Sequence, residues 1–350
     1  MALQGSGQIS FSNLVNEFGG APNISGSGGG VSLGRYRVSE NYGAMSNLPL
    51  DTGIPQSGEI RFSNFYNKQL NVVVNYYDGT NERRVLARNR YNNGPGNGRV
   101  SVIGGYRGKP SNSSGTRVIL HVNKRLGSEY DGSRGMKCAL RTGYWDGGTN
   151  LDVYIGSNGA CIGAAGAGGV GGNRSRGPSA GKRGSSGLGV QYPIDLWNYG
   201  FLAGGGGGGG GGKGEVRDRD RNERGRDRRR CGWWCESRDR NRNRRRDRRR
   251  KGGGGGGGGQ GFPGAVGGDG GGSGGSRGNA GNQNGPGGGG GGGGDGANRG
   301  GNGGSFGADG ENSNATGGHK GRSIVIEGSG SVNYVVSGTQ YGPVVNHPVF

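Results

Sequence analysis

Runs of consecutive glycine set the strongest limit on how this chain can fold. Glycine supplies 94 of the 350 residues, and 68 of these lie after residue 150. Only 28% of the chain is hydrophobic, against about 45–50% in ordinary globular domains. The second part therefore has too few apolar side chains to offset chain entropy with an ordinary core. The runs are 163–172, 204–212, 252–259, 267–275, 287–294 and 300–310.

A repeated unit at the start of the runs argues that the glycines are ordered. Leu151–Ile155 is an alternating, strand-like segment that leads into the first run, and Ile194–Asn198 leads into the second. A third, partial copy is Ser323–Gly328. Flexible linkers or disorder are the ordinary interpretation of glycine-rich segments, but linkers do not usually repeat a strand before each run.

A polyproline-II-like helix is the conformation that we expect for these runs. It rises about 3.1 Å per residue and has no internal hydrogen bonds, so one helix alone is not stable. Helices without side chains can lie close together and satisfy each other's backbone groups, each bond contributing about 0.5–1.5 kcal/mol. The sequence therefore predicts a bundle of polyglycine-II helices over 156–350, with almost no α-helix in the chain.

The first part of the chain carries a different repeat. Ser6–Asn13 (SGQISFSN) returns 51 residues later as Ser57–Asn64 (SGEIRFSN). Alternating Ile9 and Phe11 in one copy, like Ile60 and Phe62 in the other, predict a short half-buried strand followed by a helical or irregular turn. We interpret residues 1–69 as a docking or linking module.

The region 70–155 is rich in strand patterns separated by turn signals. These features predict a small antiparallel β-sandwich, with Ile119, Leu120 and Val122 in its core. His121, which lies between them, is expected on the solvent face with no ligand role. The expected strands are Leu70–Tyr77, Arg99–Tyr106, Thr116–Val122, Met136–Thr142 and Leu151–Ile155.

A charged insert interrupts the glycine-rich half at 213–251. It holds 19 Lys/Arg and 8 Asp/Glu, and so carries +11 of the net charge of +20. Arginine forks suit phosphate and carboxylate groups, and exposed tryptophan suits sugar rings. A disulfide between Cys231 and Cys235 could close the tip of a hairpin. The candidate receptor contacts are Arg230, Trp233, Trp234, Arg238 and Arg240. A solvated loop without a partner, or an Arg/Gly nucleic-acid binder, are the alternatives.

Catalytic and metal-binding patterns are not found. The three histidines have no Ser or Cys partner in a recognisable motif, and two cysteines without a nearby histidine do not make a tetrahedral metal site. We therefore expect no enzyme, no cofactor and no metal. Neither a signal peptide nor an apolar run of about 20 residues is apparent, so we expect synthesis in the host cytoplasm and no membrane insertion.

Both repeats resemble known phage proteins. The units Asp152–Gly172, Asp195–Gly212 and Ile324–Gly342 resemble the tip adhesins of T-even-type phage long tail fibres, whose glycine runs form bundled polyglycine helices. The N-terminal repeat resembles tail structural proteins of cyanophages. The resemblance implies that loops between the glycine helices contact the host receptor. The long charged insert and the separate β-rich region depart from that pattern.

These features together predict a virion tail protein that contributes to recognition of the host cell. Its partners would be other tail proteins, bound through residues 1–69, and an anionic glycan or outer-membrane component of the host. The chain could also form a homotrimer. The alternatives are a purely structural tail component and, from another class, an Arg/Gly-rich nucleic-acid-binding protein, which the eight acidic residues of the insert disfavour.

Overall fold

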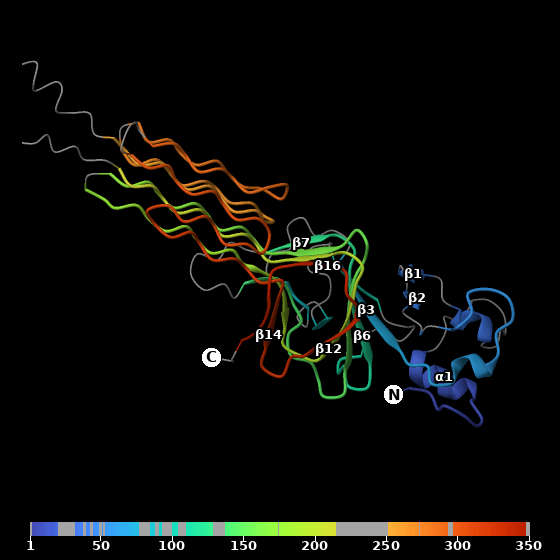
Figure 1. Cartoon of the computed structure of the whole chain (residues 1–350). Coiled ribbons are helices and arrows are strands. Elements are labelled where there is room, and N and C mark those ends of the chain that lie inside the picture. Colours follow the sequence, from blue (N-terminus) through green and yellow to red (C-terminus); the bar gives the residue numbers. More distant parts are fainter. Residues whose placement is uncertain are drawn as a thin grey trace, which may run out of the picture.

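The computed structural model comprises a β-helix with two attachments, a small N-terminal module and a glycine-rich bundle, which extend from different sides of it (Figure 1). The structure describes residues 2–19, 32–37, 40–42, 45–48, 51, 53–76, 85–87, 91–92, 100–103, 110–128, 137–173, 175–214, 251–272, 274–292 and 297–347.

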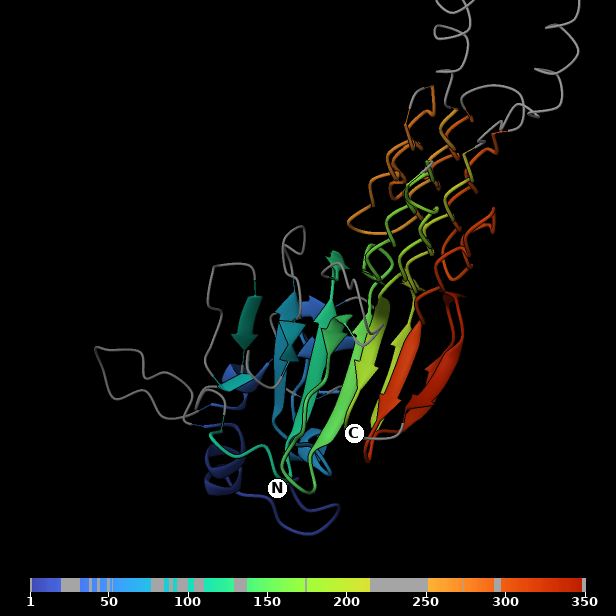
Figure 2. The same ribbon diagram turned by 90° about the vertical axis from the view of Figure 1, so that its left-hand side faces the viewer.

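Three sheets form the sides of the β-helix, and their strands lie next to one another in successive turns of the chain (Figure 2). The first sheet has the order β15-β12-β9-β6-β3-β5, with bounds Val332–Val336, Ile194–Asn198, Asn150–Ile155, Arg117–Val122, Asn71–Tyr76 and Val100–Ile103. The second is β16-β13-β10-β7, with bounds Thr339–Tyr341, Phe201–Ala203, Ala160–Ile162 and Arg125–Gly127. The third is β17-β14-β11-β8-β4, with bounds Val344–His347, Ile324–Glu327, Ser186–Val190, Cys138–Arg141 and Val85–Leu86.

Each full turn of the chain gives one strand to each sheet in the same order. The turns are β6-β7-β8, β9-β10-β11, β12-β13-β14 and β15-β16-β17. Neighbouring strands in these turns are parallel and in register, with a shift between Leu196 and Trp197 where β12 pairs with β15. Inward-facing side chains consequently stack, as in the row Val74, Leu120, Val153 and Leu196. These rows form the main hydrophobic core. Burial of each such aliphatic side chain stabilises the folded protein by about 1.5–3 kcal/mol.

The antiparallel sandwich expected over 70–155 is wrong in strand direction. All five expected strands exist, but the only antiparallel pairs among the described residues are β3 with β5 and β1 (Glu40–Tyr42) with β2 (Met45–Leu48). An alternating pattern reports which face of a strand is buried and carries no information on strand direction. The direction follows from the route of the chain, which crosses two other sheets before it returns beside its earlier strand.

The sheets also run across the boundary that we expected at residue 155. Strand β12, from the glycine-rich half, pairs in register with β9, so that Asp195 lies opposite Asp152 and Trp197 opposite Tyr154. The first two copies of the strand repeat are therefore neighbouring rungs. The expected third copy belongs elsewhere, because Ile324–Glu327 is β14 of another sheet, and Val332–Val336 takes the place beside β12.

The N-terminal module has its own apolar cluster, in which both copies of the repeat take part. The expected strands are wrong, since helix α1 (Phe11–Phe18) begins inside the first copy and 3-10 helix η2 (Phe62–Phe65) inside the second. A further 3-10 helix, η1, spans Leu33–Tyr36. The repeat encodes a helix start: the Asn13 side chain accepts a bond from the Ser10 N–H, and Asn64 accepts one from the Arg61 N–H. The two copies meet where the Phe11 and Phe62 rings pack edge to face.

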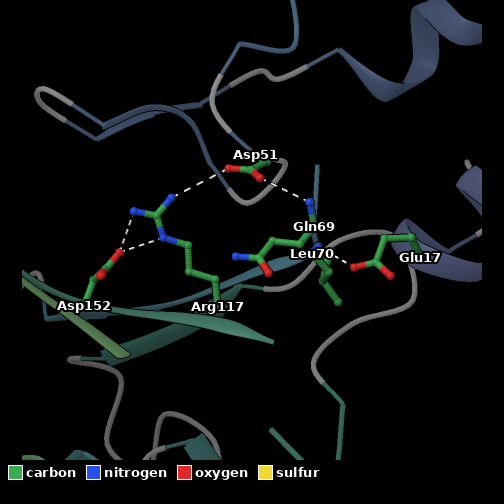
Figure 3. A network of polar contacts seen from close by, with 6 residues as sticks. All are labelled: Glu17, Asp51, Gln69, Leu70, Arg117 and Asp152. Atoms are coloured by element: carbon green, nitrogen blue, oxygen red, sulfur yellow. Dashed lines mark hydrogen bonds and ion pairs between the residues drawn. The ribbon is translucent and has the colours of Figure 1, made fainter. Parts of the chain in front are cut away.

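A polar network joins the N-terminal module to the β-helix (Figure 3). Arg117 of β6 contacts buried Asp152 of β9 at 2.6 Å and reaches Asp51 of the module at 3.7 Å. Asp51 in turn accepts a bond from the Gln69 backbone N–H. Burial raises the pKa of Asp152, and the Arg117 charge partly offsets this shift. The arginine therefore compensates a carboxylate that the sheet would otherwise leave buried and unpaired.

His121 does not lie on the solvent face, which corrects our expectation. Its side chain points away from the main core, yet the residue is only 2% exposed, and its ring lies 5.1 Å from that of Tyr154. Burial lowers the pKa of His121 to about 4, so the ring is neutral at pH 7. The outer face of this sheet thus carries a second apolar cluster, formed by Val73, Ile119 and Tyr154 with Trp197 packed against it.

Two cysteines of the described chain are buried in the β-helix, and they form no disulfide. Cys161 of β10 stacks between Leu126 and Leu202 in the core of the second sheet. Cys138 of β8 lies in the third sheet, and burial raises its pKa to about 11. Cys161 acts as a small apolar core group, whereas the Cys138 thiol interacts with the Arg141 side chain.

Candidate receptor-binding end

The glycine segments leave the β-helix at one corner, between a strand of the second sheet and the next strand of the third. Residues 163–185 connect β10 to β11, and residues 204–323 connect β13 to β14. Both connections run out from the sheets and return, so the segments lie side by side in an elongated bundle (Figures 1 and 2). Where the structure describes them, the segments of the bundle form neither α-helix nor strand.

Backbone hydrogen bonds hold the central segment, 204–212, with a period of three residues. Its successive N–H groups donate in turn to three different neighbouring segments. The donor–acceptor pairs are Gly205–Ser185, Gly208–Lys182 and Gly211–Ser179; Gly206–Gln260, Gly209–Gly257 and Gly212–Gly254; and Gly207–Ala308 and Gly210–Glu311. This period matches the three residues per turn of a polyproline-II-like helix. The glycine runs therefore pack against one another, whereas their assignment as polyglycine-II helices stays a prediction.

Carbonyl groups of the same segment accept bonds with the same period. They receive N–H groups from the segments around 166–172, 301–307 and 315–321. Segment 252–260 has an equivalent environment, donating to three segments and accepting from others. Two interior segments are thus bonded on all sides by backbone alone, which satisfies the amide groups of the runs without any side chain.

Steric contact explains why the two central segments of the bundle, 204–212 and 252–259, contain only glycine. A Cβ atom on Gly207 would lie 1.8 Å from the Gly318 carbonyl oxygen, and one on Gly208 would lie 2.0 Å from that of Ala167. At the outside of the bundle the space is open, as at Gly291, where a Cβ would meet nothing within 4 Å. The composition of each segment therefore reflects its position in the bundle, and side chains appear where a segment faces solvent.

The charged insert begins and ends at the end of the bundle that is far from the sheets (Figure 1). Segment 204–214 runs outward to that end, and segment 251–260 starts there and returns. A Cβ on Gly214 would lie 2.8 Å from the Lys251 carbonyl oxygen, so the two ends of the insert are in contact. The predicted contact residues Arg230, Trp233, Trp234, Arg238 and Arg240, and the cysteine pair Cys231 and Cys235, lie outside the described residues.

Asparagine side chains organise the surface beside the insert. The Lys213 backbone N–H donates to the Asn314 side chain at 3.0 Å, and the Asn298 amide donates to the same oxygen at 2.5 Å. Ser313 donates to the Arg299 carbonyl at 2.6 Å from the neighbouring turn. Loops that are far apart in sequence therefore meet at one surface, which we call the far end and define by Lys213, Lys251, Asn298, Arg299, Ser313 and Asn314.

Another turn at the same end uses the same chemistry. The Asn173 side chain accepts bonds from the backbone N–H groups of Ser175 and Arg176, which closes the turn after segment 163–172. These asparagines were not among the site residues predicted from the sequence. Their sequence signal is an Asn close to a glycine run, as at Asn173 directly after 163–172 and Asn298 shortly before 300–310, because Asn favours turns by bonding to its own backbone two residues on.

The far end is suited to binding anionic or hydroxyl-rich groups. Lys213, Lys251 and Arg299 supply positive charge, and the amide and hydroxyl groups supply hydrogen-bond donors and acceptors. Among the described residues, no group of three or more His, Cys, Asp or Glu side chains could hold a metal ion. In the same part of the chain no helix has the length and apolar character needed to cross a bilayer.

Comparison with known proteins gives one family and one solved structure. Residues 106–232 match the family model described as "Phage tail fibre adhesin Gp38". The solved structure is described as "Crystal structure of the gp37-gp38 adhesin tip complex of the bacteriophage S16 long tail fiber". It is 19% identical, with 84% of this chain and 90% of that chain covered and a TM-score of 0.42. No curated protein sequence is significantly similar to this chain. The family match confirms the predicted resemblance to tail-fibre tip adhesins.

Proposed function

We propose that this chain, whose residues 106–232 match a family of phage tail fibre adhesins, binds the host cell with the far end of its glycine bundle. The general role is the one that the sequence predicts, a tail protein that contributes to recognition of the host, and the family match confirms it. The observation that carries the finer assignment is that Lys213, the first residue of the charged insert, meets the loops around Asn298 and Asn314 at one exposed surface.

The bundle supports this assignment because it can act as a rigid scaffold for the recognition loops. Its interior segments are bonded by backbone on all sides, so the loops at the far end start from fixed positions. A preorganised surface loses less conformational freedom when it binds a receptor. The excess of cationic residues in and beside the insert favours an anionic glycan or another anionic component of the host envelope.

The N-terminal module is suited to attachment, and we assign residues 1–69 to docking on another tail protein. It lies on the side of the β-helix away from the bundle, as both overall views show (Figures 1 and 2). The match of residues 106–232 to phage tail fibre adhesins supports a partner of this kind. The predicted homotrimer and the predicted disulfide stay predictions.

Deletion of the insert tests the receptor assignment. Because Gly214 and Lys251 are in contact, residues 215–250 can be replaced by a short glycine bridge without stretching the bundle. We expect this variant to keep the thermal stability of the parent protein and to lose at least about tenfold in affinity for host cells, or about 1.4 kcal/mol. The matched control is Asn284→Ala, in an exposed turn at the opposite end of the bundle, which should adsorb like the parent.

Adsorption that survives the deletion would overturn the assignment and favour the purely structural alternative. Binding of the parent to single-stranded RNA, lost with the same deletion while cells are not bound, would favour the nucleic-acid alternative. Binding to an anionic glycan should weaken as salt increases, because the exposed charges are screened over about 8–10 Å at moderate ionic strength.

A further inference from the structure

Two neighbouring segments return from the bundle to the third sheet, and each carries an arginine close to its strand. Arg183 lies three residues before β11, and Arg322 lies two residues before β14. The Gly187 N–H donates to the Arg322 carbonyl at 2.9 Å, and the Arg322 N–H donates to the Ser186 hydroxyl at 3.3 Å. The two arginines therefore lie on passes of the chain that run side by side at the base of the bundle.

The backbone bonds of segment 179–185 place Arg183 apart from the rows that bind the neighbouring segments. In two rows of the three-residue period, N–H groups donate to carbonyls of the segments around 164–170 and 316–319. The donating groups are those of Ser179, Gly181, Lys182, Gly184 and Ser185. Arg183 belongs to the third row, and its side chain, like that of Arg322, is half-buried.

Neither arginine forms an ion pair with an acid of the described chain. The Glu327 carboxylate of β14 accepts a bond from Arg141 on one oxygen and from Gln191 on the other. Asp309, on a nearby turn of the bundle, lies 3.9 Å from Lys320. The carboxylates described around this part of the molecule are therefore engaged by other side chains.

Burial and repulsion act together on the two arginines. The Arg183 Nε atom is buried and has no hydrogen-bond partner in the described structure, so its desolvation is uncompensated. Burial lowers the pKa of Arg322, and the positive charge of Arg183 lowers it further. The Cys138 thiol also acts on Arg322, but burial raises its pKa to about 11, so it carries no charge at pH 7.

We propose that Arg183 and Arg322, called the arginine pair below, bind a tetrahedral oxyanion of the phosphate class. Charge selects this class, because a phosphoryl group carries about −1.5 to −2 at pH 7 and so neutralises two guanidinium groups, whereas one carboxylate neutralises only one. Guanidinium forks donate paired N–H bonds to phosphate oxygens. The buried Arg183 Nε–H would gain its acceptor in this way.

The arginine pair goes beyond the proposed receptor role, because it lies at the opposite end of the bundle from the far end. A bound oxyanion would join segments 179–185 and 315–322 where they enter β11 and β14, and so stabilise the connection between the bundle and the β-helix. Two sources share this chemistry, namely free phosphate and the phosphoryl group of a host glycan.

Calorimetric titration of the full chain with inorganic phosphate tests the proposal, at constant ionic strength so that screening does not change. Charge-assisted bonds to two guanidinium groups predict a dissociation constant of about 0.1–10 mM. The test variants are Arg183→Gln and Arg322→Gln, and we expect each to bind at least about tenfold more weakly. The matched control is Arg277→Gln, which makes the same change at a 61% exposed side chain of the bundle and should bind like the parent.

Thermal unfolding with and without phosphate gives a second measurement. At a phosphate concentration about ten times the dissociation constant, the melting temperature of the parent should rise by about 1–4 °C. The test variants should show no such rise, and the Arg277→Gln control should show the full rise. The same scans confirm that each variant is folded, and one folded test variant is sufficient.

Titration with glucose 6-phosphate and with glucose separates the two sources. Binding of the sugar phosphate at least about tenfold tighter than phosphate supports a host glycan, and equal or weaker binding supports the free ion. Glucose alone should not bind.

A parent that binds no phosphate up to about 100 mM, ten times the upper end of the expected range, would overturn the proposal. Test variants that bind like the control would also overturn it. Phosphate binding that is lost with deletion of 215–250 but kept in both test variants would assign the anion to the charged insert, with the same consequence. Host-cell adsorption is measured in parallel, so the arginine pair can fail while the receptor assignment stands.

Discussion

The β-helix and the glycine bundle are built in a similar way, but their interiors differ. In both, successive passes of the chain lie side by side and exchange backbone hydrogen bonds with their neighbours. The β-helix encloses rows of Val, Leu and Ile side chains, whereas the two central segments of the bundle, 204–212 and 252–259, carry no side chains. The β-helix is therefore stabilised chiefly by burial of apolar surface, and the bundle by close contact and hydrogen bonding of backbone.

Removal of an inward side chain from the β-helix should have the largest effect. Leu120 is fully buried and stacks between Val74 and Val153. We expect Leu120→Ala to lower the free energy of unfolding by about 2–5 kcal/mol, because the change removes apolar contacts and leaves a cavity. Chemical denaturation with fluorescence detection measures this. The control Tyr144→Ala, at a 58% exposed side chain, should change stability by less than about 0.5 kcal/mol. Equal effects would show that the core rows do not carry the stability of the β-helix.

The second largest effect is expected at low pH, which should destabilise the β-helix more than the bundle. The folded protein holds the pKa of His121 at about 4, below its ordinary value of 6.5, so the unfolded chain binds a proton first as pH falls. The free energy of unfolding of the β-helix should therefore be unaffected by His121 titration above pH 6.5. It should fall by up to about 3 kcal/mol as the pH is lowered from 6.5 to 4. His121→Leu should remove that part of the acid dependence, and His319→Leu, at an exposed side chain, should not.

Hydrogen-exchange protection measured between pH 7 and pH 4 distinguishes the regions in this experiment. The interior runs 204–212 and 252–259 contain no titratable side chain, so their protection should change less than that of β6 and β9. An acid dependence that is the same in His121→Leu as in the parent protein would contradict the role of this histidine.

Addition of one methyl group to the bundle should have a smaller but sharply position-dependent effect. Gly208→Ala places a Cβ 2.0 Å from a backbone oxygen, so we expect about 1–3 kcal/mol of destabilisation and local loss of exchange protection. Gly291→Ala is the matched control, because its Cβ meets nothing within 4 Å. This variant should be as stable as the parent or slightly more stable, because alanine lowers the conformational entropy of the unfolded chain. Equal tolerance at the two positions would exclude close backbone packing as the basis of the bundle.

Like the fold, the candidate site could be predicted from the sequence only in part. The sequence placed a cationic insert between two glycine runs and predicted that loops would reach a receptor surface. The sequence did not reveal that Lys213, Asn298 and Asn314 meet beside it, because those residues come from separate passes of the chain. Only the packing of the passes brings their turns to one end.

The sequence by itself determined the five strands expected over 70–155, the packing together of the glycine runs, and the position of the charged insert between two of these runs. These properties depend on local pattern and on the absence of side chains, both of which can be read along the chain. The tertiary structure decided that the strands are parallel, that β9 and β12 share a sheet across the expected domain boundary, and that His121 is buried. Alternation reports burial on one face of a strand, whereas direction, neighbours and the covering of the other face depend on how distant segments pack.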